Sequence, residues 1–307
     1  MAGVASPSTH ESGGTSGLTT LAVDIGGTKI EVGLVSAEGA IGERWRAPTG
    51  RPEDQEELYG TLEELIGQAM GAGPSLHAVG VGCGGPMSPG GAQVSPLNIP
   101  AWRGFALHDR LEATTGLPVY IDNDAKALAL GEGWRGAARG SLNFMAIVVS
   151  TGVGGGIVLD GRLLDGAAGN AGHIGHVIVE PQGRPCACGG YGCLEAEVSG
   201  LSIEAMTGEP AAQAAEVTRR RTGRLVGRAV ASVAQLLDLD LATVAGSVAL
   251  GFGLPFFEEA QAEIERRCGL DFARGTRIVP AGLGPDGPLI GAAAVGLRGL
   301  GVRVVGS

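Results

Sequence analysis

The chain has 307 residues, of which 56 are glycine, and a formal charge of −10 at pH 7. Its length allows about two domains that each bury a core. The glycines are interleaved with aliphatic residues and lack the collagen period, a composition that favours an α/β enzyme with glycine-rich loops. The negative charge argues against nucleic acid or an anionic membrane as partner, because both need basic clusters.

Residues 1–17 are rich in Ser, Gly, Thr and Pro and have almost nothing to bury, so we expect a disordered leader. This segment has neither the basic start nor the apolar core of a secretion signal. No apolar stretch of the sequence reaches the length of a membrane span. These features predict a cytoplasmic protein without a membrane partner.

The first part of the chain predicts a sheet flanked by a helix. Short apolar or alternating runs at 18–25, 30–36 and 41–47 are separated by turn residues, which is typical of an antiparallel meander. Apolar residues then recur at helical spacing over 53–70, with glutamates on the other face. We therefore expect three strands followed by an amphipathic helix.

Two further buried strands are expected at 78–81 and 119–121, and both run into Gly or into Asp and Asn. In open α/β sheets, ligands bind beyond the carboxyl ends of the strands. The alternation of strands and helices then starts again, which suggests two similar lobes with a cleft between them. The elements expected in the second half are strands at 144–149, 156–159 and 248–250 and helices at 225–237 and 256–267.

The turn between the first two strands, Asp24-Ile25-Gly26-Gly27-Thr28-Lys29, has the composition of a phosphate-binding loop. Glycine lets backbone N–H groups point into one concavity and lets an anion approach the main chain. Thr28 adds a hydroxyl donor and Lys29 a positive charge, while Asp24 is placed to hold Mg²⁺ through water. A simple hairpin explains two glycines as well, so both interpretations stay open for this segment alone.

Two more glycine-rich segments follow predicted strands. Ser150-Thr151-Gly152-Val153-Gly154-Gly155-Gly156 comes after 144–149, and Gly251-Phe252-Gly253 comes after 248–250. Three such segments, each at the end of a strand, are hard to explain by hairpins alone. They predict a nucleotide site with phosphates at the first two segments and adenosine at the third.

The segment Asp122-Asn123-Asp124 ends one predicted strand and precedes a helix. One interpretation is a helix N-cap, which needs only one of these residues. The other is catalytic, because phosphoryl transfer to an alcohol needs a base that takes the hydroxyl proton. Asp124 is the candidate base, and Asn123 would orient the acceptor hydroxyl.

Four soft ligands, His176, Cys186, Cys188 and Cys193, fall within eighteen residues of a loop dense in Gly and Pro. Cysteines in a reducing compartment are metal ligands or catalysts more often than disulfides. Three thiolates and one imidazole form a closed tetrahedral set for structural Zn²⁺, without a position for activated water. A second ring nitrogen of His176 would remain for a hydrogen bond to a ligand hydroxyl.

Taken in this order, the motifs resemble those of the ROK family of sugar kinases and sugar-responsive repressors, over about residues 18–300. The most specific part is the zinc signature, Gly175-His176 followed by Cys186-Ala187-Cys188-Gly189 and Gly192-Cys193-Leu194-Glu195. The segment Gly287 to Gly299 is similar to the closing helix of the family.

The resemblance implies a two-lobed actin and hexokinase-like fold, an α/β fold of the ribonuclease H-like type, with a zinc-binding loop. We expect an N-terminal lobe at 18–122, with a C-terminal helix at 288–303 that packs back on it. The C-terminal lobe is expected at 123–287 and carries the zinc loop. The family also suggests a homodimer.

For activity, the resemblance implies ATP- and Mg²⁺-dependent phosphorylation of a hexose or amino-hexose hydroxyl, usually the one on C6, with Asp124 as the base. It implies nucleotide contacts from Asp24, Gly26, Gly27, Thr28, Lys29, Thr151, Gly152, Gly154, Gly251 and Gly253. It implies sugar contacts from Gly84, Gly85, Asn98, Asn123, His176 and Glu195.

One residue departs from the family pattern. Family kinases usually carry Glu three residues before the zinc-binding His, where its carboxylate accepts bonds from two sugar hydroxyls, and here His173 takes that place. A neutral imidazole has a single acceptor nitrogen, so part of this grip is lost unless the ligand differs to match. We expect an altered choice of sugar, not an inactive enzyme.

A second class of function is a catalytically silent sugar-sensing regulator. Family repressors carry a helix-turn-helix ahead of the sugar lobes, and the few polar residues before the first strand leave no room for one. An actin-like assembling ATPase is disfavoured by the zinc loop. The sugar itself, and ATP against polyphosphate as donor, stay open.

Overall fold

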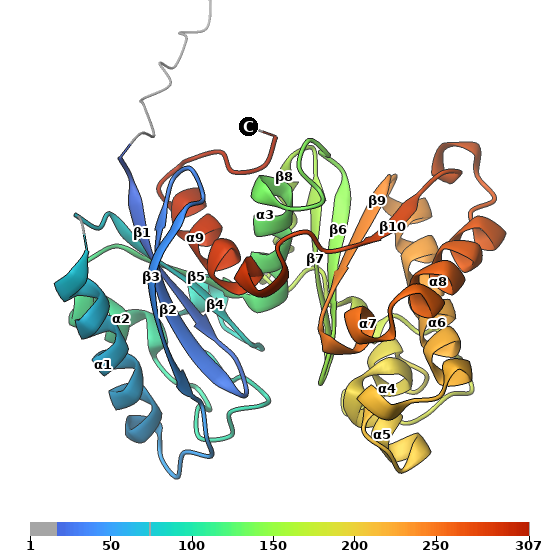
Figure 1. Ribbon diagram of the computed structural model, residues 1–307, viewed down its shortest axis with the longest axis horizontal. Helices are drawn as coiled ribbons and strands as arrows, with labels where there is room; N and C mark the ends of the chain where they lie inside the picture. Colours follow the sequence, from blue (N-terminus) through green and yellow to red (C-terminus); the bar gives the residue numbers. More distant parts are fainter. Residues whose placement is uncertain (1–16, 74, 307) are drawn as a thin grey trace, which may run out of the picture.

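The computed structural model describes residues 17–73 and 75–306, so the predicted leader lies outside the described residues except for Gly17. The strands form two five-stranded sheets, ordered β3-β2-β1-β4-β5 and β10-β9-β6-β7-β8 (Figure 1). None of the helices in the described part of the chain is long and apolar enough to cross a membrane.

The first sheet and its strands come from the N-terminal part of the chain and the second sheet from the C-terminal part. The strands are β1 Thr19–Ile25, β2 Lys29–Ser36, β3 Ile41–Pro48, β4 Ala78–Cys83, β5 Val119–Asn123, β6 Phe144–Val149, β7 Val153–Leu159, β8 Arg162–Leu163, β9 Leu241–Ala245 and β10 Arg277–Pro280. The α-helices are α1 Gln55–Ala72, α2 Leu107–Thr115, α3 Asp124–Arg135, α4 Leu194–Val198, α5 Gly200–Thr207, α6 Glu216–Leu237, α7 Ser247–Phe252, α8 Leu254–Arg267 and α9 Gly287–Gly299.

The two sheets share one topology. In each, three consecutive strands pair antiparallel (β1, β2, β3 and β6, β7, β8), and the first of them also pairs parallel with a later strand. A further parallel strand, β5 or β10, completes each sheet. The predicted repetition of the lobe is therefore confirmed at the level of strand order.

The helices lie on the outer side of each sheet and between the two sheets (Figure 1). Figure 1 shows α1 and α2 on the outer side of the first sheet and α6 and α8 on the outer side of the second. The helices α3 and α9 lie between the sheets and pack against each other. Each outer layer buries its own apolar cluster, and a third cluster contains α3, α9 and the inner faces of both sheets.

Close contact around α9 depends on glycine. A Cβ at Gly80 of β4 would lie 2.1 Å from the carbonyl oxygen of Ala292 in α9. A Cβ at Gly291 of α9 would lie 2.7 Å from the carbonyl oxygen of Ala127 in α3. Real Cβ atoms do not approach backbone oxygens so closely, so these positions require glycine for the helices to pack at this distance.

Several predicted elements are confirmed. The meander, the strands at 78–81, 119–121 and 144–149, and the helices near 53–70 and 256–267 are present. In α1 the carboxylate of Asp54 caps the start of the helix, accepting the N–H groups of Glu56 and Glu57 at 2.8 and 2.9 Å. The closing helix is present as α9 Gly287–Gly299, but the prediction that it extends to residue 303 is wrong, because the chain turns at Leu300 and Gly301.

Other predictions are wrong. Residues 248–250 are not a strand but part of α7, and the strand lies earlier, as β9 Leu241–Ala245. Gly246, with φ of +100°, makes the break between them. The predicted strand 156–159 begins at Val153, and α6 begins at Glu216 instead of Leu225.

Candidate active site and metal centre

Asp24 and Asp124 are brought together by the ends of three parallel strands. In the register of the first sheet, Asp24 of β1 lies beside Gly82 of β4, and Gly82 lies beside Asp122 of β5. A Cβ at Gly82 would lie 3.8 Å from Oδ1 of Asp24 and 3.7 Å from the Cα of Asp124. The two carboxylates that the sequence singles out therefore flank one glycine.

Asp124 is the first residue of α3 and is exposed to solvent. Protein atoms crowd it on the other sides, and this partial desolvation raises the pKa of its carboxyl group above the usual value of 3.8. Its Oδ1 accepts the N–H of Ala125 at 2.8 Å, and it forms no ion pair with any side chain that the structure describes. Asn123 is the N-cap and accepts the same N–H at 3.0 Å, so capping does not require Asp124.

The pKa of Asp24 is also raised, from 3.8 to about 7. Burial is the largest cause, and the neighbouring carboxylate of Asp124 adds to it. Two adjacent carboxylates with little positive charge beside them suit a hard divalent cation such as Mg²⁺. The donor set therefore fits the magnesium ion that a nucleotide would bring.

The first glycine turn is tight and touches the predicted sugar loop. The N–H of Gly26 donates to the carbonyl of Lys29 at 3.0 Å, and the Thr49 hydroxyl donates to the carbonyl of Gly26 at 2.6 Å. A Cβ at Gly27 would lie 2.6 Å from the Cβ of Asn98. Gly27 and Asn98, far apart in the sequence, are thus in contact.

Two residues of the first turn differ in their surroundings. Thr28 is exposed at the tip of the turn. Lys29 begins β2, and its ammonium group pairs with the buried carboxylate of Glu31 two residues further on. The structure thus shows Lys29 neutralising an acidic side chain of its own strand.

The predicted sugar residues of the N-terminal half lie together. A Cβ at Gly85 would lie 3.3 Å from Nδ2 of Asn123, and the N–H of Leu97 donates to the carbonyl of Gly85 at 3.3 Å. Gly84 precedes Gly85 directly after β4. Asn123, at the end of β5, and the loop that carries Asn98 therefore both approach Gly85.

His173 extends this group from the C-terminal half. Its side chain is exposed on one side, and protein atoms cover part of the ring. This partial burial is the larger cause, and nearby His176 the smaller one, of a pKa below 6.5. Asp124 and Glu195 are close enough to oppose that shift. The ring centroids of His173 and His176 are 6.2 Å apart. His173, His176 and Glu195 thus lie near one another, and His173 is within electrostatic reach of Asp124.

The second glycine turn is shorter than predicted. The N–H of Ser150 donates to the carbonyl of Gly152 at 2.9 Å, and Thr151 is exposed between them. Oε2 of Glu195 accepts the N–H of Val153 at 2.9 Å, which joins this turn to α4. The assignment of Gly154 to a loop is wrong: it lies in β7, where a Cβ would be 2.9 Å from the Cβ of Ala125.

The third glycine segment belongs to helices. Gly251 is in the last turn of α7, and Gly253, with φ of +60°, separates α7 from α8. The hydroxyls of Ser150 and Ser247 are 3.0 Å apart, which places the start of α7 beside the second turn. Gly251 and Gly253 lie at the far end of this helix, and the structure brings neither into contact with the second turn.

The four soft ligands form a compact group. The ligand atoms of His176, Cys186, Cys188 and Cys193 all lie within 4.8 Å of one another. Sγ of Cys188 is 3.7 Å from Sγ of Cys193, and Sγ of Cys186 is 3.7 Å from Nδ1 of His176. Zn–S bonds of about 2.3 Å in a tetrahedron place two sulfur atoms about 3.8 Å apart. The donor set and its spacing fit zinc.

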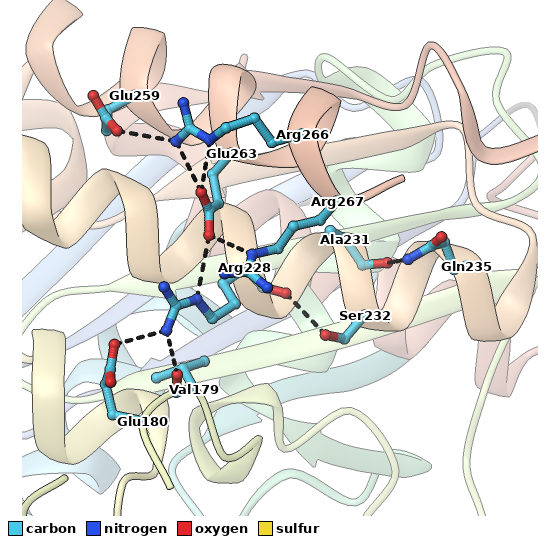
Figure 2. Close-up of polar contacts among 10 residues, drawn as sticks. All are labelled: Val179, Glu180, Arg228, Ala231, Ser232, Gln235, Glu259, Glu263, Arg266 and Arg267. Carbon is cyan, nitrogen blue, oxygen red and sulfur yellow. Dashed lines mark hydrogen bonds and ion pairs between the residues drawn. The ribbon is translucent and has the colours of Figure 1, made fainter. Parts of the chain in front are cut away.

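The segment that follows His176 is anchored to two outer helices (Figure 2). Arg228 of α6 donates from Nη1 to the carbonyl of Val179 and to Oε1 of Glu180, each at 2.7 Å. Its Nε donates at 3.2 Å to Glu263 of α8. Burial opposes ionisation of Glu263, but hydrogen bonds from Arg267, Arg266 and Arg228 outweigh it and lower its pKa to about 2.

Sequence reasoning missed a second charged group behind Asp124. Lys126, whose side chain is 3% exposed, pairs with Asp122 and with Asp165, and Arg298 of α9 also pairs with Asp165. The available signal was Lys126 itself, a lysine on an otherwise apolar helix face, four residues after Asp122, which precedes the helix. Asp165 and Arg298 carried no local signal.

The comparisons with known proteins agree with one another. The family model described as "ROK family" matches residues 20–298. A glucokinase of Halalkalibacterium halodurans is 35% identical over 244 residues, which are 76% of this chain and 74% of that protein. An N-acetylmannosamine kinase of Escherichia fergusonii is 36% identical over 253 residues, which are 77% of this chain and 85% of that protein.

A solved structure extends the likeness to the fold. A ROK family glucokinase from Streptomyces griseus, in complex with glucose and AMPPNP, superimposes with a TM-score of 0.77 at 30% identity. The match covers 91% of this chain and 99% of that one. By sequence, by strand order and by its actin-like α/β architecture, the chain belongs to the ROK family and is an ATP-dependent sugar kinase.

Proposed function

We propose that this kinase phosphorylates a hexose or amino-hexose, on the C6 hydroxyl, with Asp124 as the general base. The observation that carries the proposal is the state of Asp124: it is exposed, it is not held in an ion pair, and it lies beside Asp24 across Gly82. Burial raises the pKa of its carboxyl group, which makes Asp124 a stronger base than an ordinary aspartate.

The sugar would lie between the two groups of polar side chains. Asn98 and Asn123 supply amide donors and acceptors on one side, with the backbone of Gly84 and Gly85. On the other side the proposed contacts are His173, His176 and Glu195. Each sugar hydroxyl needs a donor and an acceptor, and these groups provide both. The named substrates of the relatives, glucose and N-acetylmannosamine, fit such a wall.

The nucleotide would follow the glycine turns. We place its phosphates at Gly26, Gly27 and Thr28 and at Thr151 and Gly152. The adenosine would lie near Gly251 and Gly253, with Gly154 supporting the turn from β7. Lys29 would reach a phosphate only after leaving Glu31. The Streptomyces griseus kinase, which was solved with AMPPNP, supports this use of ATP.

In the reaction, Asp124 accepts the proton of the sugar hydroxyl while the hydroxyl oxygen forms a bond to the γ-phosphorus of ATP. The bond between the γ-phosphorus and the β,γ-bridging oxygen breaks, and ADP leaves with that oxygen. Asn123 holds the hydroxyl in line. Asp24 would hold the hydrated Mg²⁺ that neutralises charge on the transferred group. Polyphosphate as an alternative donor is part of the test below.

The zinc would be structural. His176, Cys186, Cys188 and Cys193 fill four positions and leave none for water, so the ion supplies rigidity and no chemistry. Nδ1 of His176 lies on the cysteine side, which leaves Nε2 for a hydroxyl of the sugar. By likeness to the family we also propose a homodimer in the cytoplasm.

The experiment measures ADP release with a panel of hexoses and amino-hexoses, using ATP and polyphosphate as donors. We expect release that depends on one sugar, and Asp124→Ala should lower kcat about a thousandfold because a general base contributes 10²–10⁴. Sugar binding by the variant, measured by calorimetry, should persist. A variant that keeps more than a tenth of the wild-type kcat would remove Asp124 from the role of base.

A further inference from the structure

A group of four charged side chains lies directly behind the proposed site. Nζ of Lys126 is 2.8 Å from Oδ1 of Asp122, 2.9 Å from Oδ1 of Asp165 and 3.0 Å from the carbonyl oxygen of Gly169. Nη2 of Arg298 is 2.6 Å from Oδ2 of Asp165. Its Nη1 is 3.6 Å from Oδ2 of Asp122. We call Asp122, Lys126, Asp165 and Arg298 the hinge cluster.

The hinge cluster joins segments that belong to different sheets. Asp122 is in β5 of the first sheet, and Arg298 is in α9, which packs on β4 and β1 of the same sheet. Lys126 is in α3, which packs on β7 and β6 of the second sheet. Asp165 follows β8, the edge strand of the second sheet. The cluster therefore crosses from one half of the molecule to the other.

The cluster also holds the loop that leads to His173. Residues 164–172 contain Gly166, Gly169 and Gly172, all with positive φ. Within the described residues, the side-chain hydrogen bonds and ion pairs that reach this loop from outside come from Lys126 and Arg298. The two ends of the loop are also held by packing, Leu164 against the core of the second half and Gly172 against Gly155 of β7. His173 directly follows Gly172 and lies within electrostatic reach of Asp124.

The charged side chains of the cluster differ in how much they are exposed to solvent. Lys126 is almost fully buried, whereas Asp165 and Arg298 are 46% and 39% exposed. Burial pushes the pKa of Asp165 up, but hydrogen bonds from Arg298 and Lys126 hold it below its usual value. An ammonium group buried with its partners this close has one geometry, so it can fix a glycine-rich loop in space.

We propose that Lys126 is a positioning residue for the sugar side of the active site, acting through Asp165 and Gly169 to hold the loop that carries His173. Asp124 and Lys126 are two residues apart on α3, so the base and the lysine that holds the loop are on one helix. The inference rests on the proposed role of His173 as a sugar contact. We therefore expect changes in the hinge cluster to alter the affinity for sugar and not the affinity for ATP.

The test uses Asp165→Ala as the first variant, because Asp165 is partly exposed and its loss leaves Lys126 with Asp122. We expect the KM for sugar to rise about tenfold, as for the loss of a supporting group around a site, with the KM for ATP within about twofold of wild type. Lys126→Met should give the same pattern. If Lys126 acts through Asp165, the double variant with Lys126→Met and Asp165→Ala should have a sugar KM less than about twofold above that of Asp165→Ala alone.

The control is Arg110→Gln, which removes an ion pair between α2 and α1, where Arg110 grips Glu56 at 2.7 and 2.8 Å. It should leave both KM values unchanged. An unchanged sugar KM in Asp165→Ala, an equal rise in both KM values, or additive effects in the double variant would each overturn the proposal.

Amide hydrogen exchange separates this inference from the proposed function. In Asp165→Ala, residues 164–176 should exchange faster while residues 186–193 exchange as in wild type. If no sugar is phosphorylated by the wild-type chain, the proposed function fails, yet faster exchange in this loop still supports its positioning by Lys126. Unchanged exchange overturns the positioning role whatever the activity.

Discussion

At the scale of single residues, His173 is the position at which the proposed sugar site departs from the family pattern. A carboxylate at this position accepts from two hydroxyls, whereas a neutral imidazole accepts from one. Its pKa is lowered by burial and by His176, so the ring is neutral at physiological pH and lies near the carboxylates of Asp124 and Glu195. The residue keeps the polarity of the wall but changes its hydrogen-bonding pattern.

We expect His173→Glu to change the preference among hexoses. Regaining a charged acceptor should improve kcat/KM for a sugar with two free hydroxyls at this position by about tenfold, since such a bond contributes about 1.5–3 kcal/mol. The measurement is kcat/KM across the hexose panel, with His173→Gln as a neutral control. An unchanged ranking of sugars would remove His173 from the specificity argument.

Asp24 links the site to stability through pH. Its pKa rises to about 7 on folding, so the folded chain favours the neutral form and loses stability as pH rises through 7. Asp24→Asn removes this loss and should make the magnesium-free chain more stable than wild type by about 2 kcal/mol at pH 8, below the full linkage value because Asp24 is partly exposed.

This gain should shrink toward pH 5, where wild-type Asp24 is mostly protonated in the folded chain. Urea unfolding at several pH values measures it. The same variant should lose most of its stabilisation by added Mg²⁺ and ATP, because it lacks the carboxylate. A gain that is equal at pH 5 and pH 8 would show that ionisation of Asp24 is not its cause.

At the scale of elements, the zinc loop shows how a segment without regular structure becomes a rigid wall. Its ligands are gathered from the turn Ile174–His176, from the loop itself and from the start of α4, while Arg228 fixes the chain after His176. Glu195 of α4 is in turn bonded to the N–H of Val153. The metal group, the sugar wall and the second glycine turn are thus connected.

Cys188→Ser removes an exposed ligand and should release most of the zinc. We expect faster amide exchange over residues 177–198 and a rise of about tenfold in the KM for sugar, because Glu195 and His176 lose their support. Zinc content measured by atomic emission checks the first step. Cys268→Ser, at a cysteine outside the group, should keep the zinc, and a wild-type chain that contains no zinc would contradict the assignment.

The same scale shows where sequence patterns succeed. The periodic segment of α1 and the meander were predictable because local residues alone decide them. Residues 248–250 were not, since Val-Ala-Leu suits a strand or a helix and the break at Gly246 settles the choice. Gly154 and Gly156 suggest a loop in the sequence, but they lie in β7, where the missing Cβ atoms let α3 approach the sheet.

At the scale of the whole molecule, α3 and α9 form the layer between the two sheets (Figure 1). The crossing of these helices depends on Gly291, whose absent Cβ leaves room for the carbonyl of Ala127. Glu132 of α3, fully buried, accepts the N–H groups of Gly282 and Leu283 just before α9. This helix pair therefore sets how the two halves face each other.

Gly291→Ala should destabilise the chain by about 2–3 kcal/mol, the cost of overpacking a dense core, and should lower kcat because α3 carries Asp124. Urea unfolding and steady-state kinetics measure the two effects. Gly67→Ala is the matched control: Gly67 is in α1 with nothing within 4 Å of its Cβ position, so alanine should stabilise the helix by about 0.5–1 kcal/mol. Equal stability of both variants would refute the packing argument.

The sequence by itself determined the family, and it singled out the candidate carboxylates, glycine turns and zinc ligands. These are local signals, because each depends on neighbours within a few residues. The tertiary structure decided that Asp24 and Asp124 flank Gly82, and that Gly27 touches Asn98. It also decided that Lys126 reaches Asp165. Such contacts join segments tens of residues apart, and their geometry comes from strand register and helix packing, which no local pattern encodes.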